Sequence, residues 1–225
     1  MLERGEERTG AEAPSGNGNG GRSEDADASY VAVCPVTPEL ARQIVSLTDL
    51  RWDGEGAWEA GDAAMRALGW RDDAETELSF MARFVTGTGH HVYDGDRAFL
   101  MPFTELYEVG PDCAFTEDSW GGLPGWTSRK GAGRAEYDAH FSDAVGRFRT
   151  LLGPPELDAV VRDPDVPGGQ HRYTGWRRGG NVLLLGQGTE PCSYHSNEEA
   201  RVVISPLPAD GGFPPAGNLY AFCQF

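Results

Sequence analysis

Apolar residues at a spacing of three or four predict two short helices in the first third of the chain. The first covers residues 38–48 and the second about 55–68. Thr37 suits the N-cap of the first helix, because its hydroxyl can accept a hydrogen bond from a free backbone N–H group. Gly69 suits the end of the second, because glycine adopts the left-handed conformation that closes many helices. Each helix has one apolar face, so the two are expected to pack together or on a common sheet.

The most regular helix is predicted over residues 135–152. Five apolar side chains at spacings of four and three form a single stripe along it: Tyr137, Phe141, Val145, Phe148 and Leu152. Such a stripe is typical of a helix that covers a sheet. Gly153 and the two prolines after it end the helix.

Alternating apolar and polar residues predict the strands. They are expected at 30–36, 78–84, 171–177, 181–185, 201–204 and 219–225. Residues 104–109 are a further candidate, although Pro102 interrupts that stretch. Asp94-Gly95 predicts a hairpin with a two-residue turn, and Arg178-Gly179-Gly180 predicts a second hairpin.

Residues 110–135 are rich in glycine and proline and predict a long loop without regular structure. The loop contains the run Trp120–Trp126 (WGGLPGW), whose tryptophans either fold back over the core or form a functional lid. The chain as a whole has strands and helices in separate runs. This order predicts an α+β fold, with a mainly antiparallel sheet and about three helices packed on one face.

Residues 1–29 combine glycine, serine and acidic residues with almost no large apolar side chain. Such a segment cannot bury enough apolar surface to offset the entropy of ordering. The sequence therefore predicts a disordered acidic tail, followed by a single α+β domain over residues 30–225.

The charge of the chain narrows the classes of partner. Its 35 Asp and Glu residues against 19 Lys and Arg residues give a net charge of -16. This excess repels nucleic acids and anionic membranes and favours a basic protein partner, although acidity also serves solubility alone. The first residues are charged and no stretch approaches the roughly 20 apolar residues that cross a bilayer, so a cytoplasmic location is expected.

No catalytic motif is present in the sequence. It contains no nucleophile elbow, P-loop, dinucleotide fingerprint or zincin helix. Asp94 with Asp96, or Glu198 with Glu199, would form carboxylate pairs for acid/base catalysis, but turn chemistry and a solvated loop explain them more simply. We therefore predict no catalytic residue and no cofactor, and favour a protein that is not an enzyme.

The sequence offers one weak metal signal. Cys192 and His195 have the spacing of two zinc ligands, but no second pair matches it among the other cysteines, Cys34, Cys113 and Cys223. His90 and His91 are adjacent, and adjacent residues of a strand point to opposite faces. No metal site is predicted, and whether Cys192 and His195 bind a metal stays open.

An acidic stretch beside an aromatic residue is the first candidate for partner binding. Guanidinium groups of a partner would pair with carboxylates and stack on an aromatic ring. The alternative is a solvated loop before a strand. Together with the tryptophans of the long loop, the predicted partner-binding residues are Trp70, Asp72, Asp73, Glu75, Glu77, Trp120 and Trp126.

Four stretches of the chain carry a resemblance to a known group of proteins. They are LLGPPE at the end of the third helix, TGWRRGGNVLLLGQG, RVVISPLP, and upstream LRWDGEGAWEAGDAAMRALGW. Together they resemble small uncharacterised actinobacterial proteins, some of which are similar to immunity proteins of polymorphic-toxin systems. The resemblance implies a non-catalytic inhibitor of a basic protein. Two alternatives stay open: an enzyme or small-ligand binder with 110–135 as a lid, and a structural or scaffold component.

Overall fold

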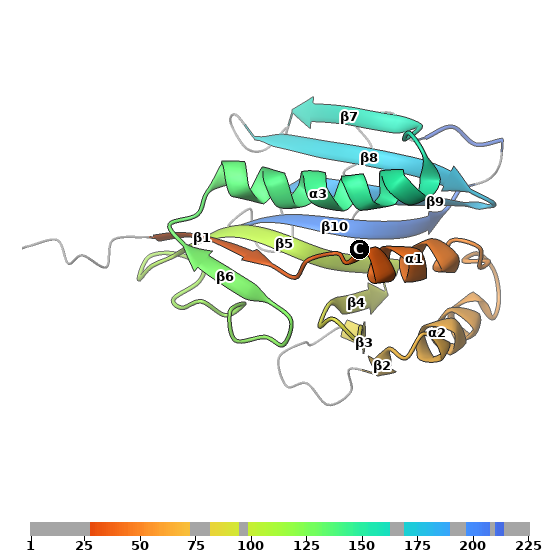
Figure 1. Cartoon of the computed structure of the whole chain (residues 1–225), viewed down its shortest axis with the longest axis horizontal. Coiled ribbons are helices and arrows are strands. Elements are labelled where there is room, and N and C mark those ends of the chain that lie inside the picture. The colour runs from red at the N-terminus through yellow and green to blue at the C-terminus, as the bar shows by residue number, and fades with distance from the viewer. Residues whose placement is uncertain are drawn as a thin grey trace, which may run out of the picture.

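A computed structural model of the chain describes residues 28–72, 82–94, 99–162, 169–189, 197–207 and 210–213. These residues form three helices, α1 (Pro38–Leu47), α2 (Ala57–Ala67) and α3 (Arg134–Leu152). Their strands are β1 (Ala28–Val33), β2 (Arg71–Asp72), β3 (Ala82–Val85), β4 (His91–Asp94), β5 (Phe99–Val109), β6 (Thr127–Lys130), β7 (Leu157–Arg162), β8 (Gln170–Arg178), β9 (Asn181–Thr189) and β10 (Asn197–Pro206). The predicted α+β fold is confirmed (Figure 1).

The ten strands form one sheet in which all strand pairs are antiparallel. Its order is β2-β3-β4-β5-β10-β9-β8-β7, and β1 joins β5 and carries β6 on its other edge. β5 is the central strand, since β4 and β1 share one of its edges while β10 follows the other. This arrangement brings the ends of β1, β5 and β10 together.

Pro102 does not interrupt its strand, contrary to the sequence-based expectation. β5 continues through it from Phe99 to Val109. The pairing of β5 with β10 changes register between Ala200 and Arg201, where Arg201 lies opposite Pro102. A proline is tolerated at this point because a bulge already breaks the regular hydrogen-bond ladder there.

The helices cover one face of the sheet and form the main core with it (Figure 1). In α3 the predicted stripe is confirmed for Tyr137, Phe141, Val145 and Phe148, all of which are buried. The predicted ends of the two short helices are also confirmed. The Thr37 hydroxyl accepts a hydrogen bond of 3.1 Å from the backbone N–H of Leu40, and Gly69 has a φ of 81°.

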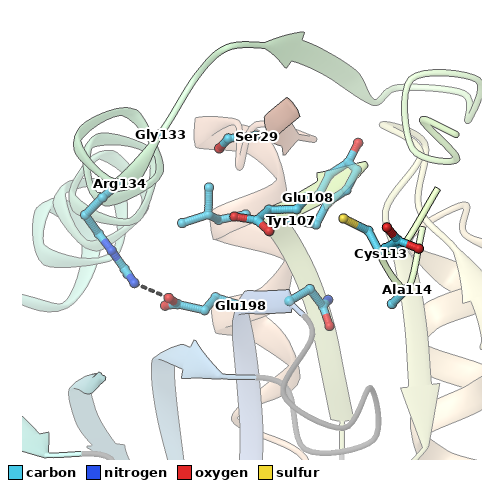
Figure 2. A pocket seen from close by; sticks show the side chains of 11 residues that line it. Ser29, Tyr107, Glu108, Cys113, Ala114, Gly133, Arg134 and Glu198 are labelled. Atoms are coloured by element: carbon cyan, nitrogen blue, oxygen red, sulfur yellow. Dashed lines mark hydrogen bonds and ion pairs between the residues drawn. The ribbon is translucent and has the colours of Figure 1, made fainter. Parts of the chain in front are cut away.

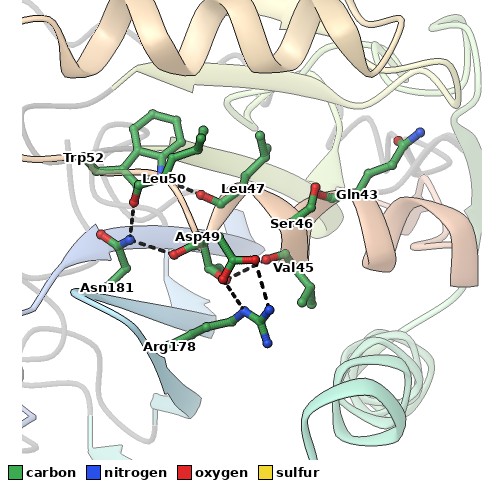
Figure 3. A network of polar contacts seen from close by, with 10 residues as sticks. Gln43, Val45, Ser46, Leu47, Asp49, Leu50, Trp52, Arg178 and Asn181 are labelled. Carbon is green, nitrogen blue, oxygen red and sulfur yellow. Dashed lines mark hydrogen bonds and ion pairs between the residues drawn. The ribbon is translucent and has the colours of Figure 1, made fainter.

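The connection between α1 and α2 is tied to the turn between β8 and β9 (Figure 3). The side-chain N–H₂ group of Asn181 donates to the backbone oxygens of Thr48 and Leu50, at 2.8 and 2.7 Å. Arg178 pairs with Asp49 through two contacts of 2.8 and 3.0 Å. These bonds satisfy carbonyl groups at the end of α1 that have no partner within the helix.

Three predictions about connections need correction. The segment 110–135 is not a structureless loop, because it contains β6, which pairs with β1. The segment after α3 contains β7, which is absent from the strands predicted from the sequence. The hairpin predicted at Asp94-Gly95 is present as β4 and β5, but Asp94 lies opposite Phe99, so its connection has four residues, 95–98, which lie outside the described residues. Pairing over a long sequence distance decides the first, since β1 lies far earlier in the chain than β6, whereas the other two pairings join consecutive strands.

The hairpin at Gly179-Gly180 is confirmed, since Arg178 lies directly opposite Asn181. The strand predicted at 219–225 and most of the strand predicted at 78–84 lie outside the described residues. The predicted tail also lies outside them except for residues 28 and 29, which already belong to β1. Among the helices of the described residues, none has the length and apolarity to cross a membrane.

Candidate partner-binding site

An open cavity of about 550 Å³ lies where the start of β1, the end of β5, the start of β10 and the start of α3 meet (Figure 2). Strand register places its residues: Glu108 lies opposite Ser29, and Glu198 lies opposite Leu106. The turn after β5 closes the cavity on its remaining side. The lining residues are Ser29, Leu106, Tyr107, Glu108, Asp112, Cys113, Ala114, Gly133, Arg134, Asn197 and Glu198.

One ion pair crosses the cavity wall. Figure 2 shows Arg134 reaching from the first residue of α3 to the carboxylate of Glu198 at the start of β10. The guanidinium of Arg134 also lies 5.4 Å from the centre of the Tyr137 ring. Burial alone would lower the pKa of Arg134, but its hydrogen bond and charge interaction with Glu198 raise that pKa above its ordinary value. Arg134 therefore remains charged at neutral pH.

Three buried polar atoms near the start of β10 have no hydrogen-bond partner among the described residues. They are the second carboxylate oxygen of Glu198 (Oε2), the amide oxygen of Asn197 (Oδ1) and the hydroxyl of Tyr137. The amide nitrogen of Asn197 is already used, because it donates to Glu105 Oε2 at 2.8 Å. A buried polar atom without a partner costs about 1–3 kcal/mol. The two carbonyl-type oxygens can only accept, so they favour a ligand that brings N–H donors.

Further carboxylates surround the mouth of the cavity. Glu108 and Asp112 are exposed, and neither forms an ion pair within the described part of the chain. Glu108 and Asp112 line the cavity together with Glu198, while Arg134 is the only cationic side chain among its described lining residues. Three carboxylates against one guanidinium leave an excess of two negative charges. The cavity therefore attracts cationic groups.

Trp120 and Trp126 lie beside this cavity rather than over it. Their rings pack against each other with centroids 4.4 Å apart, in a cluster that includes Tyr107. The hydroxyl of Tyr107, which also lines the cavity, donates to Asp118 at 2.7 Å. Ser128 on β6 bonds the same carboxylate, so Asp118 connects the cluster to β6. Burial by itself would raise the pKa of Asp118, but these hydrogen bonds hold that pKa below its usual range.

The tryptophans of the long loop and Trp70 lie on opposite faces of the sheet. Trp70 is 3% exposed and belongs to the core beneath the helices, where its indole N–H donates to Gln43 at 3.0 Å. Asp72 is exposed on β2 and pairs with Arg66 at 2.9 Å, and this hydrogen bond lowers the pKa of Asp72. The other predicted members of that stretch lie outside the described residues: Asp73, Glu75 and Glu77. Trp70 and Asp72 are therefore not part of one exposed surface.

Sequence reasoning missed most of the cavity. Glu198 and Glu199, expected in a solvated loop, belong to β10 and are largely buried, and Glu199 pairs with Arg201 at 2.6 Å. Glu108, Asp112 and Arg134 carried no sequence signal, because each is an ordinary charged residue. Only the strand register brings these positions into one site.

A buried cysteine–histidine contact is a second piece of chemistry that the sequence did not reveal. Cys34 Sγ lies 3.3 Å from His90 Nδ1, and His90 Nε2 lies 2.7 Å from the backbone oxygen of Cys34. The Thr88 hydroxyl lies 3.0 Å from His90 Nδ1. Burial raises the pKa of Cys34 to about 12 and lowers the pKa of His90 to about 4. At neutral pH both groups are uncharged, so the pair lacks the thiolate of an activated nucleophile.

Within the described ranges, no three His, Cys, Asp or Glu side chains are grouped as ligands of a metal would be. Cys192 and His195 lie outside these ranges, so their prediction is untested. His91 lines a second cavity together with Arg71, and Thr88, which contacts His90, lines the same cavity. No family model, no curated protein and no solved structure matches the chain.

Proposed function

We propose that the protein is a non-catalytic cytoplasmic binding protein, of the immunity type, that inhibits a basic protein partner. Its cavity at the ends of β1, β5 and β10 receives a lysine or arginine side chain of that partner. The observation that carries the proposal is the described lining of the cavity, in which Glu108, Asp112 and Glu198 face a single cationic residue, Arg134.

The hydrogen-bonding capacity of the cavity supports a cationic side chain as the anchor. Glu198 Oε2 and Asn197 Oδ1 are buried acceptors without donors. A guanidinium brings five N–H donors in a rigid fork and an ammonium brings three. Asn197 and Glu198 are adjacent in β10 and point to opposite faces of the sheet, so either group inserted beside Arg134 donates to Glu198 and neutralises part of the charge excess. Buried anchors of this kind contribute most of the binding energy in many protein interfaces.

The exposed carboxylates around the mouth act on the rate of association. Glu108 and Asp112 lie outside any ion pair in the described residues, so their field extends into solvent. Such a field steers an oppositely charged partner and raises the association rate, and salt screens it. The affinity for the partner is therefore expected to fall as ionic strength rises.

A peptide titration tests the proposal. A fluorescent arginine-rich peptide serves as the probe, and its binding is followed by anisotropy at low and high salt. The double variant Glu108→Gln with Asp112→Asn is expected to weaken binding by up to about fivefold for each carboxylate removed. The matched control is Glu55→Gln with Glu59→Gln, which removes the same charge from the start of α2, where both residues are exposed.

The two double variants separate a site from a general charge effect. Equal weakening in both would show that only net charge matters, and binding unaffected by either would refute the cavity as the site. The same pair of variants applies to affinity capture from native lysate at low and high salt. A basic protein retained by wild type and by the control, but lost with the cavity variant, would support the inhibitor function.

A small-ligand function is the second candidate, and one observation favours it. A cavity of about 400 Å³ lies between residues 85–91 and residues 123–125, which belong to the segment considered as a lid. Arg71 lines this cavity, and its guanidinium forms no ion pair with a described residue. Tryptophan fluorescence during titration with a panel of metabolites tests this function, since Trp126 follows directly in the chain. No response across the panel would argue against it.

A further inference from the structure

β7 (Leu157–Arg162) is the outermost strand at one end of the sheet. It pairs with β8, and no described strand follows its other edge (Figure 1). A strand edge of this kind presents unpaired N–H and C=O groups to another strand. β7 is therefore a surface that a further strand can extend.

The exposed side chains of β7 are an acidic, an apolar and a basic residue in succession. Residues alternate between partly buried and exposed positions, and the exposed ones are Asp158, Val160 and Arg162. Val160 is 62% exposed, and Leu151, at 39%, is the other exposed large hydrophobic side chain in the described part of the chain. Neither Asp158 nor Arg162 forms an ion pair with a described residue. An exposed valine thus lies between two opposite charges that lack partners.

We propose that β7 pairs with β7 of a second copy of this chain, antiparallel and centred on Val160. A two-fold axis then passes beside Val160, and each Val160 faces the partner subunit's Val160. Asp158 lies opposite the partner subunit's Arg162, and Arg162 lies opposite the partner subunit's Asp158. The surface is self-complementary, as a two-fold interface requires.

Only this register matches all three outward side chains. A shift of the centre by one residue sets a charge opposite Val160. A shift by two sets Asp158 against the partner subunit's Asp158, or Arg162 against the partner subunit's Arg162. Like charges directly opposite each other destabilise a strand pair, whereas opposite charges and paired β-branched residues stabilise it.

The other face of β7 supports the same register. Ala159 and Val161 point to that face and pack against a second apolar cluster of the sheet. This cluster consists of Leu100, Tyr173, Val182, Leu184, Val203 and Leu207. In the proposed pairing Ala159 lies opposite the partner subunit's Val161, so an apolar pair adjoins the cluster of each copy. The backbone ladder and both side-chain faces are therefore compatible with one continuous sheet across the dimer.

Charge reversal tests the pairing in the full chain. Sedimentation velocity over a concentration series gives the dissociation constant of the dimer at a fixed ionic strength. Asp158→Arg or Arg162→Asp alone places like charges at two symmetric positions, and each is expected to raise that constant about tenfold. The double variant Asp158→Arg with Arg162→Asp restores opposite charges and is expected to recover the wild-type value.

A matched control removes the effect of net charge. Arg147→Asp on α3 changes the charge by as much as Arg162→Asp does, at an exposed residue outside β7. It is expected to leave the dissociation constant within about twofold of wild type. A wild-type protein that stays monomeric throughout the series, or single variants that match the control, would overturn the proposal.

Disulfide trapping supplies an independent measurement. In the proposed register two cysteines at position 160 face each other across the axis, at a separation that a disulfide spans. Under mild oxidation Val160→Cys is expected to give a covalent dimer that wild type and Leu151→Cys do not give. Equal yields from Val160→Cys and Leu151→Cys would refute the register, even if the protein is dimeric.

Discussion

Mild acid is expected to destabilise the fold through His90. The ring is fully buried, and its Nε2–H donates to the backbone oxygen of Cys34 at 2.7 Å, because a carbonyl oxygen can only accept. Nδ1 faces the Thr88 hydroxyl at 3.0 Å and the Cys34 thiol at 3.3 Å. Burial lowers the pKa of His90, the hydrogen bond to the Cys34 backbone oxygen offsets part of this, and His91 lowers it again, which leaves a value of about 4. The folded protein therefore keeps this ring neutral.

The sign and size of the effect follow from the two pKa values. Between pH 6.5 and 4 the unfolded chain binds a proton at His90 that the folded chain does not. The free energy of unfolding therefore falls as the pH falls through this range. The difference between the ordinary value of 6.5 and about 4 corresponds to about 3 kcal/mol in total. About 2 kcal/mol of this is lost by pH 5, before most carboxylates titrate.

Urea unfolding followed by tryptophan fluorescence measures this loss. The free energy of unfolding is determined between about pH 7 and pH 5 for wild type and His90→Gln. The variant is less stable at every pH, because it disturbs a buried hydrogen-bond network, but its stability is expected to change less with pH. The slope, not the absolute stability, carries the test.

His140→Gln is the control for this experiment. Burial also lowers the pKa of His140, but that side chain is partly exposed on α3, so its contribution is smaller. Carboxylates with lowered pKa values, such as Asp72 and Asp118, act equally in both proteins and cancel in the comparison. Parallel pH dependence in wild type and His90→Gln would show that His90 titrates normally, and would refute the reasoning.

Three substitutions test the packing, each by urea unfolding against wild type. Asn181→Ala leaves two backbone oxygens at the end of α1 without donors and is expected to cost about 2–4 kcal/mol; a loss below 0.5 kcal/mol would contradict the network. Phe148→Ala empties the centre of the core beside Trp176 and is expected to cost about 3–5 kcal/mol. Gly125→Ala brings a Cβ atom to 2.0 Å from the Thr88 backbone oxygen, so the two segments must separate; unchanged tryptophan fluorescence and stability would contradict that contact.

The helices follow from local sequence features that the structure confirms. The stripe of α3 depends on contacts between residues three and four apart, and the Thr37 cap depends on a bond to Leu40. The β8–β9 hairpin is equally local, since Gly179-Gly180 joins strands that are adjacent in the chain. Fold class was predictable for the same reason, because the order of the elements limits how their apolar faces can be buried.

Strand pairing over long distances was not predictable from these patterns. β6 lies in a segment with the composition of a loop, and it becomes a strand because the edge of β1 is available to it. Pro102 would end an isolated strand, but its position beside a bulge removes the cost. In each case the deciding partner lies far away in the sequence, where periodicity carries no information.

The sequence by itself determined the helices and their caps, the α+β class, one hairpin and the acidity of the chain, because each depends on composition or on neighbouring residues. The tertiary structure alone decided which acidic side chains lie close together. Register between β1, β5 and β10 groups Glu108, Asp112 and Glu198 around one cavity, whereas packing buries Trp70 in the core. Composition alone gives the net charge of the chain. Which charged side chains lie close together depends on long-range strand pairing, which local sequence patterns do not specify.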